Sequence, residues 1–165
     1  MPMPDGDPRL PRERRLARRM ARRYLRLPMR DRMLLLEAVM RLAMARLSLI
    51  FVPFSVLASR LGAVERADPD SSVAPPLPLQ QQEAVRKIGW AVTRAARYIP
   101  FRAVCLPQAI AAKAMLRRRG IASVMHFGVA KTREKMDAHA WLDAGRIEVT
   151  GYPVEASYVE VARFV

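Results

Sequence analysis

Cys105-Leu-Pro-Gln108 and Ala138-His-Ala-Trp-Leu-Asp143 are the stretches of this sequence that decide its fold. Pro107 suits the first turn of a helix, and Gly120, after three arginines, suits its end, so we expect a helix from about 106 to 119. The second stretch alternates between polar and apolar side chains, which predicts a strand at 138–142. A turn at Ala144-Gly145 would pair this strand with 146–150 as a hairpin.

The rest of the chain supplies helices first and strands afterwards. Apolar spacing and the positions of proline and glycine predict helices at 12–27, from 33 to Pro53, at 54–61 and at 83–98, and strands at 121–130 and 158–164. Prolines, serines and glutamines predict a linker over 65–82. This order indicates an α+β class. We expect a basic N-terminal extension (1–27), a helical subregion with the Pro-rich linker (28–82) and a catalytic core (83–165), in one compact domain.

Composition excludes several classes of protein. Of the 165 residues only Cys105 is a cysteine, which rules out an internal disulfide and fits a reducing compartment. With two histidines and no metal-ligand spacing, no metal site is expected. The most apolar window, 34–58, is interrupted by Glu37, Arg41, Arg46 and Pro53, so it predicts buried helices without stable membrane insertion.

The formal net charge is +14, and the excess lies mainly in residues 9–32, which contain eleven arginines. On the predicted helix 12–27 four of them share one face: Arg15, Arg19, Arg22 and Arg26. A solvated helix face, a docking surface for an acidic partner and a nucleic-acid contact would all give this pattern. No nucleic-acid-binding motif accompanies the charge, so a nucleic-acid partner is not expected.

Cys105 and His139 are the residues with nucleophilic chemistry. The thiolate is the reactive form of cysteine, and both a helix N-terminus and a neighbouring imidazolium favour it. Amides at the start of the same helix could hold an oxyanion, with Gln108 one turn further on. Taken singly, Cys105 also reads as a small buried residue and His139 as a half-buried sheet residue. His126 is expected to be structural, and Trp141 to be core or pocket wall.

The predicted hairpin register places candidate orienting groups beside His139. A turn at Ala144-Gly145 pairs His139 with Thr150 and Trp141 with Glu148, so Thr150 is the direct neighbour and Glu148 the diagonal one. A slip of one residue in the turn would move both side chains to the other face of the sheet.

The ordered set Cys105-Leu-Pro-Gln-Ala, Leu116-Arg-Arg-Arg-Gly120-Ile, Phe127-Gly-Val129 and Ala138-His-Ala-Trp-Leu142 resembles the transglutaminase-like leader peptidases of lasso-peptide biosynthesis. The segments Arg32–Ala38 and Pro53-Phe54 are similar to the helical region of the stand-alone members. The resemblance implies a papain/transglutaminase-like fold and a cytoplasmic cysteine protease, and no cofactor is expected. Such enzymes remove the leader from a ribosomally made precursor peptide, and a separate cyclase then closes the macrolactam.

The resemblance also implies roles and partners. Cys105 matches the nucleophile and His139 the general base. The third residue of the family is an aspartate, where this sequence has Thr150; Glu148 is the candidate substitute, and Asp143 is too close in sequence to reach back. The chain is too short to hold the leader-binding module of fused members. The implied partners are therefore the precursor peptide, a separate small leader-recognition protein and the cyclase.

Three other functions compete with leader removal. The first is a different acyl-transfer enzyme on the same scaffold, such as an amidase or a transglutaminase. The second is a degenerate scaffold that binds a leader or a partner without cutting it, which the missing aspartate favours. The third is an adaptor for nucleic acid or a membrane surface that uses the N-terminal arginines.

Overall fold

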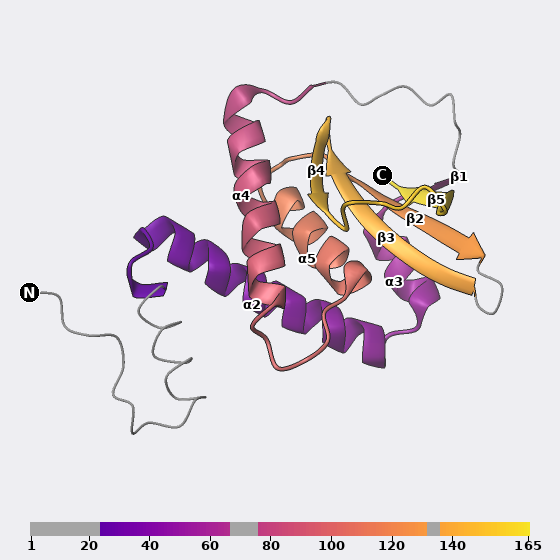
Figure 1. Cartoon of the computed structure of the whole chain (residues 1–165), viewed down its shortest axis with the longest axis horizontal. Coiled ribbons are helices and arrows are strands. Elements are labelled where there is room, and N and C mark those ends of the chain that lie inside the picture. Colours follow the sequence, from indigo (N-terminus) through magenta and orange to yellow (C-terminus); the bar gives the residue numbers. More distant parts are fainter. Residues whose placement is uncertain (1–23, 67–75, 132–135) are drawn as a thin grey trace, which may run out of the picture. The chain divides into compact units, whose positions relative to one another are not determined.

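The computed structural model describes residues 24–66, 76–131 and 136–165. The chain divides into two compact units, residues 1–34 and 35–165. Most of the predicted helix at 12–27 lies outside the described residues. In the first unit, Arg32 Nε donates to Leu27 O (2.8 Å), which fixes the turn before the first helix of Figure 1. That helix, α2, runs Met29–Phe51 and continues into the second unit.

The second unit contains the remaining helices and a five-stranded antiparallel sheet in the order β1-β5-β2-β3-β4 (Figure 1). The helices are α3 (Phe54–Leu61), α4 (Leu79–Ala96) and α5 (Cys105–Arg117), and the strands are β1 (Val64–Arg66), β2 (Val124–Lys131), β3 (Met136–Ala144), β4 (Ile147–Thr150) and β5 (Val159–Phe164). The predicted α+β class, with a helix packed on an antiparallel sheet, is confirmed. No described helix is long and apolar enough to cross a membrane.

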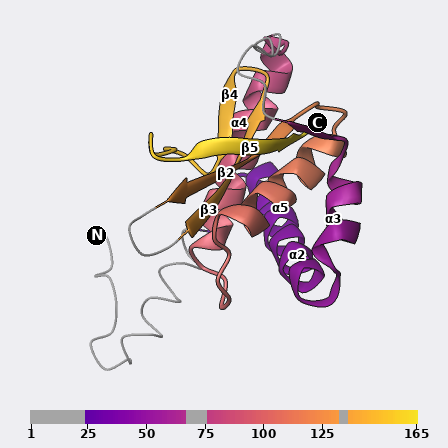
Figure 2. The same ribbon diagram turned by 90° about the vertical axis from the view of Figure 1, so that its right-hand side faces the viewer.

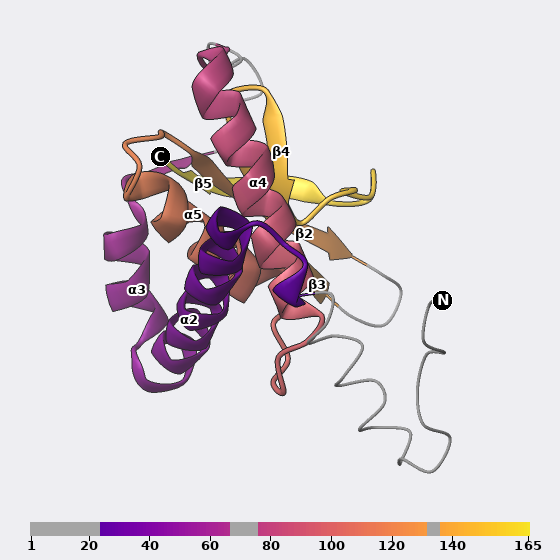
Figure 3. The same cartoon turned by 90° about the vertical axis from the view of Figure 1, so that its left-hand side faces the viewer.

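Helices α4 and α5 pack together against the sheet. α5 contacts β3 and β4, and Figure 2 shows α5 on one side of β2, β3 and β5. α4 runs along β4 (Figure 3). The approach of α4 to β4 is close because a Cβ built on Gly89 would lie 2.6 Å from Val149 O, so no larger residue fits there. The largest fully buried side chains are Leu42, Val85, Ile88, Val92, Pro107, Met115, Leu116, Met125 and Leu142.

Two features of the predicted linker at 65–82 are wrong. β1 is a strand of three residues that pairs with β5, and it is too short to leave a periodic signal. α4 begins at Leu79 instead of Glu83 because the glutamines after Pro78 are good helix formers and continue the helix. Gln82 Nε2 also donates to Leu77 O (2.8 Å), which ties the first turn to the segment before it.

The predicted hairpin register is also wrong. The turn is Gly145-Arg146, so that Ala144 pairs with Ile147 and Asp143 with Glu148. Gly145 has φ +59° at the first turn position, as in the II′ turns that suit two-residue hairpins, whereas Ala144-Gly145 would place glycine second. A bulge at Val149 then shifts the ladder, and Thr150 lies opposite Leu142 instead of His139.

Candidate active site

Cys105 is the first residue of α5 and is partly exposed. Val104 has extended backbone angles, and the first helical hydrogen bond runs from Gln108 N to Val104 O (3.4 Å). The N–H groups of Cys105 and Leu106 therefore lie ahead of the helical ladder, where amides have no partner inside their own helix. An anion formed beside the thiol would meet these amides and the positive end of the helix dipole.

Gln108 anchors the start of α5. Its side-chain Nε2 donates to Ala103 O (2.7 Å), across the turn that carries Cys105. This bond engages the amide of Gln108 with the backbone before Cys105 and so holds the Cys105 turn in place. Gln108 also lines the cavity beside Cys105.

His139 lies on β3, and its Nε2 is 2.6 Å from the carbonyl oxygen of Gly151. A carbonyl oxygen only accepts, so Nε2 carries the proton that it donates in this bond. In the neutral imidazole Nδ1 is then the unprotonated nitrogen, which can act as a base. The ring also packs against Tyr158 (5.2 Å between ring centroids) and Trp141 (6.0 Å).

Cys105 and His139 line one cavity of about 360 Å³. α4, α5, β3, β4 and the loop after β4 all contribute to its wall, through Thr93, Cys105, Gln108, His139, Glu148, Val149, Thr150, Gly151, Tyr152 and Pro153. The fold thus places Cys105, at the start of α5, and His139, on β3, on the wall of one cavity. This arrangement of thiol, imidazole and helix amides suits nucleophilic attack on a carbonyl carbon.

Neither predicted orienting side chain bonds to His139. Thr150 is buried (3% exposed), and its hydroxyl has no hydrogen-bond partner among the described residues. Glu148 is exposed and lies opposite Asp143 in the ladder. Both residues reach the cavity wall, but the hydrogen-bond acceptor for His139 is the main chain of Gly151.

His126 occupies a partly buried ionic cluster on the neighbouring strand. Its Nδ1 is 2.8 Å from Glu160 Oε1, and its Nε2 is 3.3 Å from Asp143 Oδ2, a distance of ionic contact without hydrogen-bond geometry. Arg163 binds Glu160 through two nitrogens, each at 3.1 Å. Burial lowers the pKa of His126, but the two carboxylates outweigh it and raise the pKa overall. The prediction that His126 is structural fits this position.

Trp141 connects this cluster to the site. Its ring stacks on His126 (5.4 Å between centroids, 4° between planes) and on His139 (22° between planes). Trp141 is 9% exposed and belongs to the core, one of its two predicted positions. Gly128 makes room for it, because a Cβ there would lie 2.8 Å from the Trp141 ring.

Sequence reasoning missed three residues around the site: Gly151, Tyr152 and Tyr158. The Tyr152 hydroxyl donates to Asp143 Oδ1, and the Tyr158 hydroxyl donates to Asp137 Oδ2 (2.6 Å). The bond to Asp137 raises the pKa of Tyr158 to about 12. The sequence did contain a signal for these residues, because Gly151 directly follows a strand and both tyrosines lie in the loop after it.

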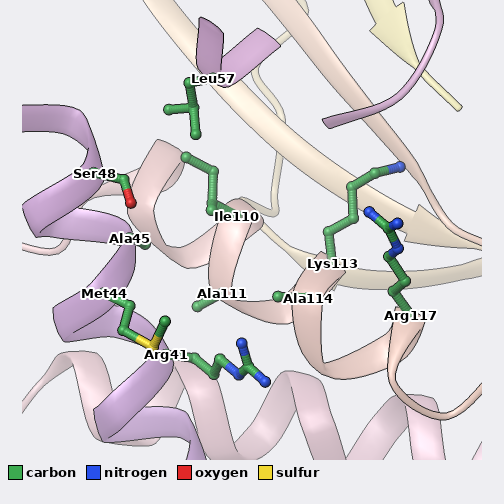
Figure 4. Close-up of a pocket in the computed structure, with 10 residues that line it drawn as sticks. All are labelled: Arg41, Met44, Ala45, Ser48, Leu57, Ile110, Ala111, Lys113, Ala114 and Arg117. Atoms are coloured by element: carbon green, nitrogen blue, oxygen red, sulfur yellow. The ribbon is translucent and has the colours of Figure 1, made fainter. Parts of the chain in front are cut away.

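A second cavity, of about 270 Å³, lies between α2, α3 and α5, away from Cys105 (Figure 4). Leu57 and Ile110 point towards one another, and Lys113 extends beside Arg117. The Lys113 ammonium is buried and donates to Ser123 O (2.7 Å) and Phe164 O (3.0 Å). Burial, with a smaller contribution from the charge of Arg117, lowers the pKa of Lys113 to about 8. Its two carbonyl bonds tie α5 to the sheet, so we assign Lys113 a structural role.

The model of the transglutaminase-like superfamily matches residues 48–163, which include Cys105, His139 and the loop after β4. Comparisons with curated proteins and with solved structures gave no significant match.

Proposed function

Because this chain belongs to the transglutaminase-like superfamily, we propose that it is a cysteine peptidase that removes the leader from a ribosomally made lasso-peptide precursor. The observation that carries the proposal is the shared cavity: Cys105 at a helix start and His139, whose Nδ1 is the unprotonated nitrogen of the neutral ring, line the same cavity. The leader-peptide substrate rests on the ordered motifs around these two residues. A separate leader-recognition protein would deliver the precursor, and the cyclase would act on the product.

The reaction is acyl transfer to water. His139 Nδ1 takes the proton of the Cys105 thiol, and the sulfur attacks the scissile carbonyl carbon. The N–H groups of Cys105 and Leu106 stabilise the resulting oxyanion. Collapse of this intermediate breaks the C–N bond, and the imidazolium gives its proton to the departing amine of the core peptide.

Hydrolysis of the thioester completes the cycle. His139 takes a proton from water, and the hydroxide attacks the acyl carbon. The C–S bond breaks, the leader leaves with a new carboxylate, and the thiolate regains a proton. The net change is the addition of one water across the scissile amide.

The experiment uses the precursor with its delivery protein and reads the product masses. Leader removal gives two fragments whose masses sum to the precursor plus one water, whereas isopeptide formation loses ammonia. We expect Cys105→Ala and His139→Ala each to slow cleavage by at least about a thousandfold. His126→Gln is the matched histidine control and should retain cleavage under conditions where it is folded. If Cys105→Ala cleaves at the parent rate, the peptidase proposal is wrong.

A binding scaffold without catalysis is the second candidate, and one observation favours it. No side-chain carboxylate of the described residues bonds to His139, so the imidazole lacks the charged partner of the family pattern. Iodoacetamide at pH 6 separates the two functions. Alkylation of Cys105 at this pH supports the enzyme, and reaction only near pH 8.5, the range of an ordinary thiol, supports the scaffold.

A further inference from the structure

We propose that the main-chain carbonyl of Gly151, held in place by the hydrogen bond from Tyr152 to Asp143, orients His139 in place of a side-chain carboxylate. The inference rests on the proposed function, because it names the third group of the same site. It assigns Gly151, Tyr152 and Asp143 as positioning residues, since each acts through His139.

The hydrogen bond between His139 and Gly151 fixes the tautomer of the imidazole. At 2.6 Å the Gly151 carbonyl accepts from His139 Nε2, and an acceptor at this nitrogen leaves Nδ1 unprotonated in the neutral ring. A triad carboxylate has the same two effects of fixing the tautomer and the ring orientation. A carbonyl dipole also stabilises an imidazolium, although less than a full negative charge does.

The backbone at Gly151 is held in one arrangement. Gly151 has φ +86°, a region that side chains disfavour. A Cβ there would lie 2.5 Å from Ala140 O and 2.8 Å from Trp141 Cα, so the loop lies directly on the backbone of β3. Ala140 and Trp141 are the two residues that follow His139 on β3. The carbonyl and the imidazole are therefore positioned by the same piece of strand.

Tyr152, the residue after Gly151, is anchored to β3 by its hydroxyl. The Tyr152 hydroxyl donates to Asp143 on β3, four residues after His139. Burial and the bond to Asp143 raise the pKa of Tyr152, so the phenol remains a donor at neutral pH. Asp143 also faces His126 at 3.3 Å. Through these contacts Asp143, which is too near His139 in sequence to bind it directly, would act on it indirectly.

The sharpest test changes the carbonyl and keeps every side chain. Replacing Tyr152 by its α-hydroxy acid converts the Gly151–Tyr152 amide into an ester, whose carbonyl is a weaker acceptor. The first readout is the His139 Nε2 proton in NMR spectra of the Cys105→Ala background, assigned by its loss in His139→Gln. With the normal amide we expect a downfield, exchange-protected resonance. With the ester we expect it to move upfield and exchange faster.

The second readout is alkylation of Cys105 by iodoacetamide at pH 6, with Cys105 intact. The ester weakens the hydrogen bond from His139 to Gly151, and His139 becomes charged when it takes the thiol proton. We therefore expect the alkylation rate to fall about tenfold in the ester. Tyr152→Phe, which removes only the anchoring hydroxyl, should lower the rate in the same direction. Tyr98→Phe is the matched control, because Tyr98 is exposed and does not line the cavity, and its rate should stay within about twofold.

Each outcome bears on the inference. An unchanged Nε2 proton and unchanged alkylation in the ester overturn it, and so does a His139 protonated only at Nδ1. If circular dichroism shows that the ester does not fold, the comparison of Tyr152→Phe with Tyr98→Phe decides by the same two readouts. Failure of the peptidase proposal looks different, because Cys105→Ala would still cleave precursor while the Nε2 proton kept its signature.

Discussion

Thr150 pairs with Leu142 across β3 and β4, and both side chains are buried. Paired residues of an antiparallel ladder point to the same face, so Thr150 shares the side of the sheet that meets α5. The Thr150 hydroxyl has no hydrogen-bond partner within the described part of the chain, and an unpaired buried hydroxyl destabilises the fold. Position 150 is therefore a buried position in the cavity wall whose side chain does not bond to His139.

Thr150→Val should stabilise the protein. Valine has the same shape and lacks the unpaired hydroxyl, so we expect the free energy of unfolding to rise by about 1 kcal/mol in urea denaturation. Leader cleavage should stay within about twofold. Thr150→Asp is the contrasting variant and should lose at least about 3 kcal/mol, because it buries an unpaired charge. A tenfold loss of cleavage in Thr150→Val would show that the hydroxyl serves His139 after all.

Glu148→Gln should leave cleavage within about threefold. Glu148 is exposed, and none of the described hydrogen bonds or ion pairs joins it to His139. The matched variant is Glu160→Gln, which weakens the partly buried contacts to His126 and Arg163 and should lower the free energy of unfolding by about 1–2 kcal/mol. Cleavage rates and urea midpoints of both variants test the assignment. A hundredfold loss in Glu148→Gln would make Glu148 the orienting group.

His126 should make stability depend on pH above 6.5. Its pKa is raised in the folded state, so the folded protein binds this proton more tightly than the unfolded chain does. The stabilisation is fully present below about pH 6.5, the pKa of histidine in the unfolded chain. It is lost as the pH rises through the pKa of His126 in the folded protein. Urea midpoints between pH 6 and pH 9 should fall in the parent protein more than in His126→Gln. Equal slopes would contradict the ionic cluster.

Lys113 should give the opposite slope at higher pH. Its pKa is about 8 in the folded protein and 10.5 as the reference value, so the unfolded chain binds more protons between these limits and stability rises with pH. Urea denaturation of the parent between pH 7.5 and 9.5 should show this rise relative to Lys113→Met. The raised pKa values of Tyr152 and Tyr158 lower stability only above pH 10, equally in both proteins.

The sequence was sufficient for the parts of the site that local rules determine. Pro107 in the first turn and Gly120 after the last placed the helix start at Cys105 to within one residue, because backbone sterics at these positions hold in any context. The alternation around His139 gave its strand. The class followed from the order of helices and strands.

What the sequence could not provide was the register. The choice between Ala144-Gly145 and Gly145-Arg146 as the turn depends on which position takes a positive φ, and the bulge at Val149 adds a further shift. Together they place Thr150 opposite Leu142. The contact between Gly151 and His139 was equally hidden, because a backbone carbonyl is present at every residue and only the path of the loop decides which one meets the imidazole.

The acceptor that His139 uses has a genetic consequence. Point mutation can replace any side chain, yet no codon removes a carbonyl from the main chain. Codon changes at position 151 act only through the space around the glycine, and nearly all would displace the loop, since a Cβ meets Ala140 O and Trp141. If the carbonyl orients His139 as we propose, a chain without a carboxylate at this position need not be inactive, and its third side chain alone does not decide its class.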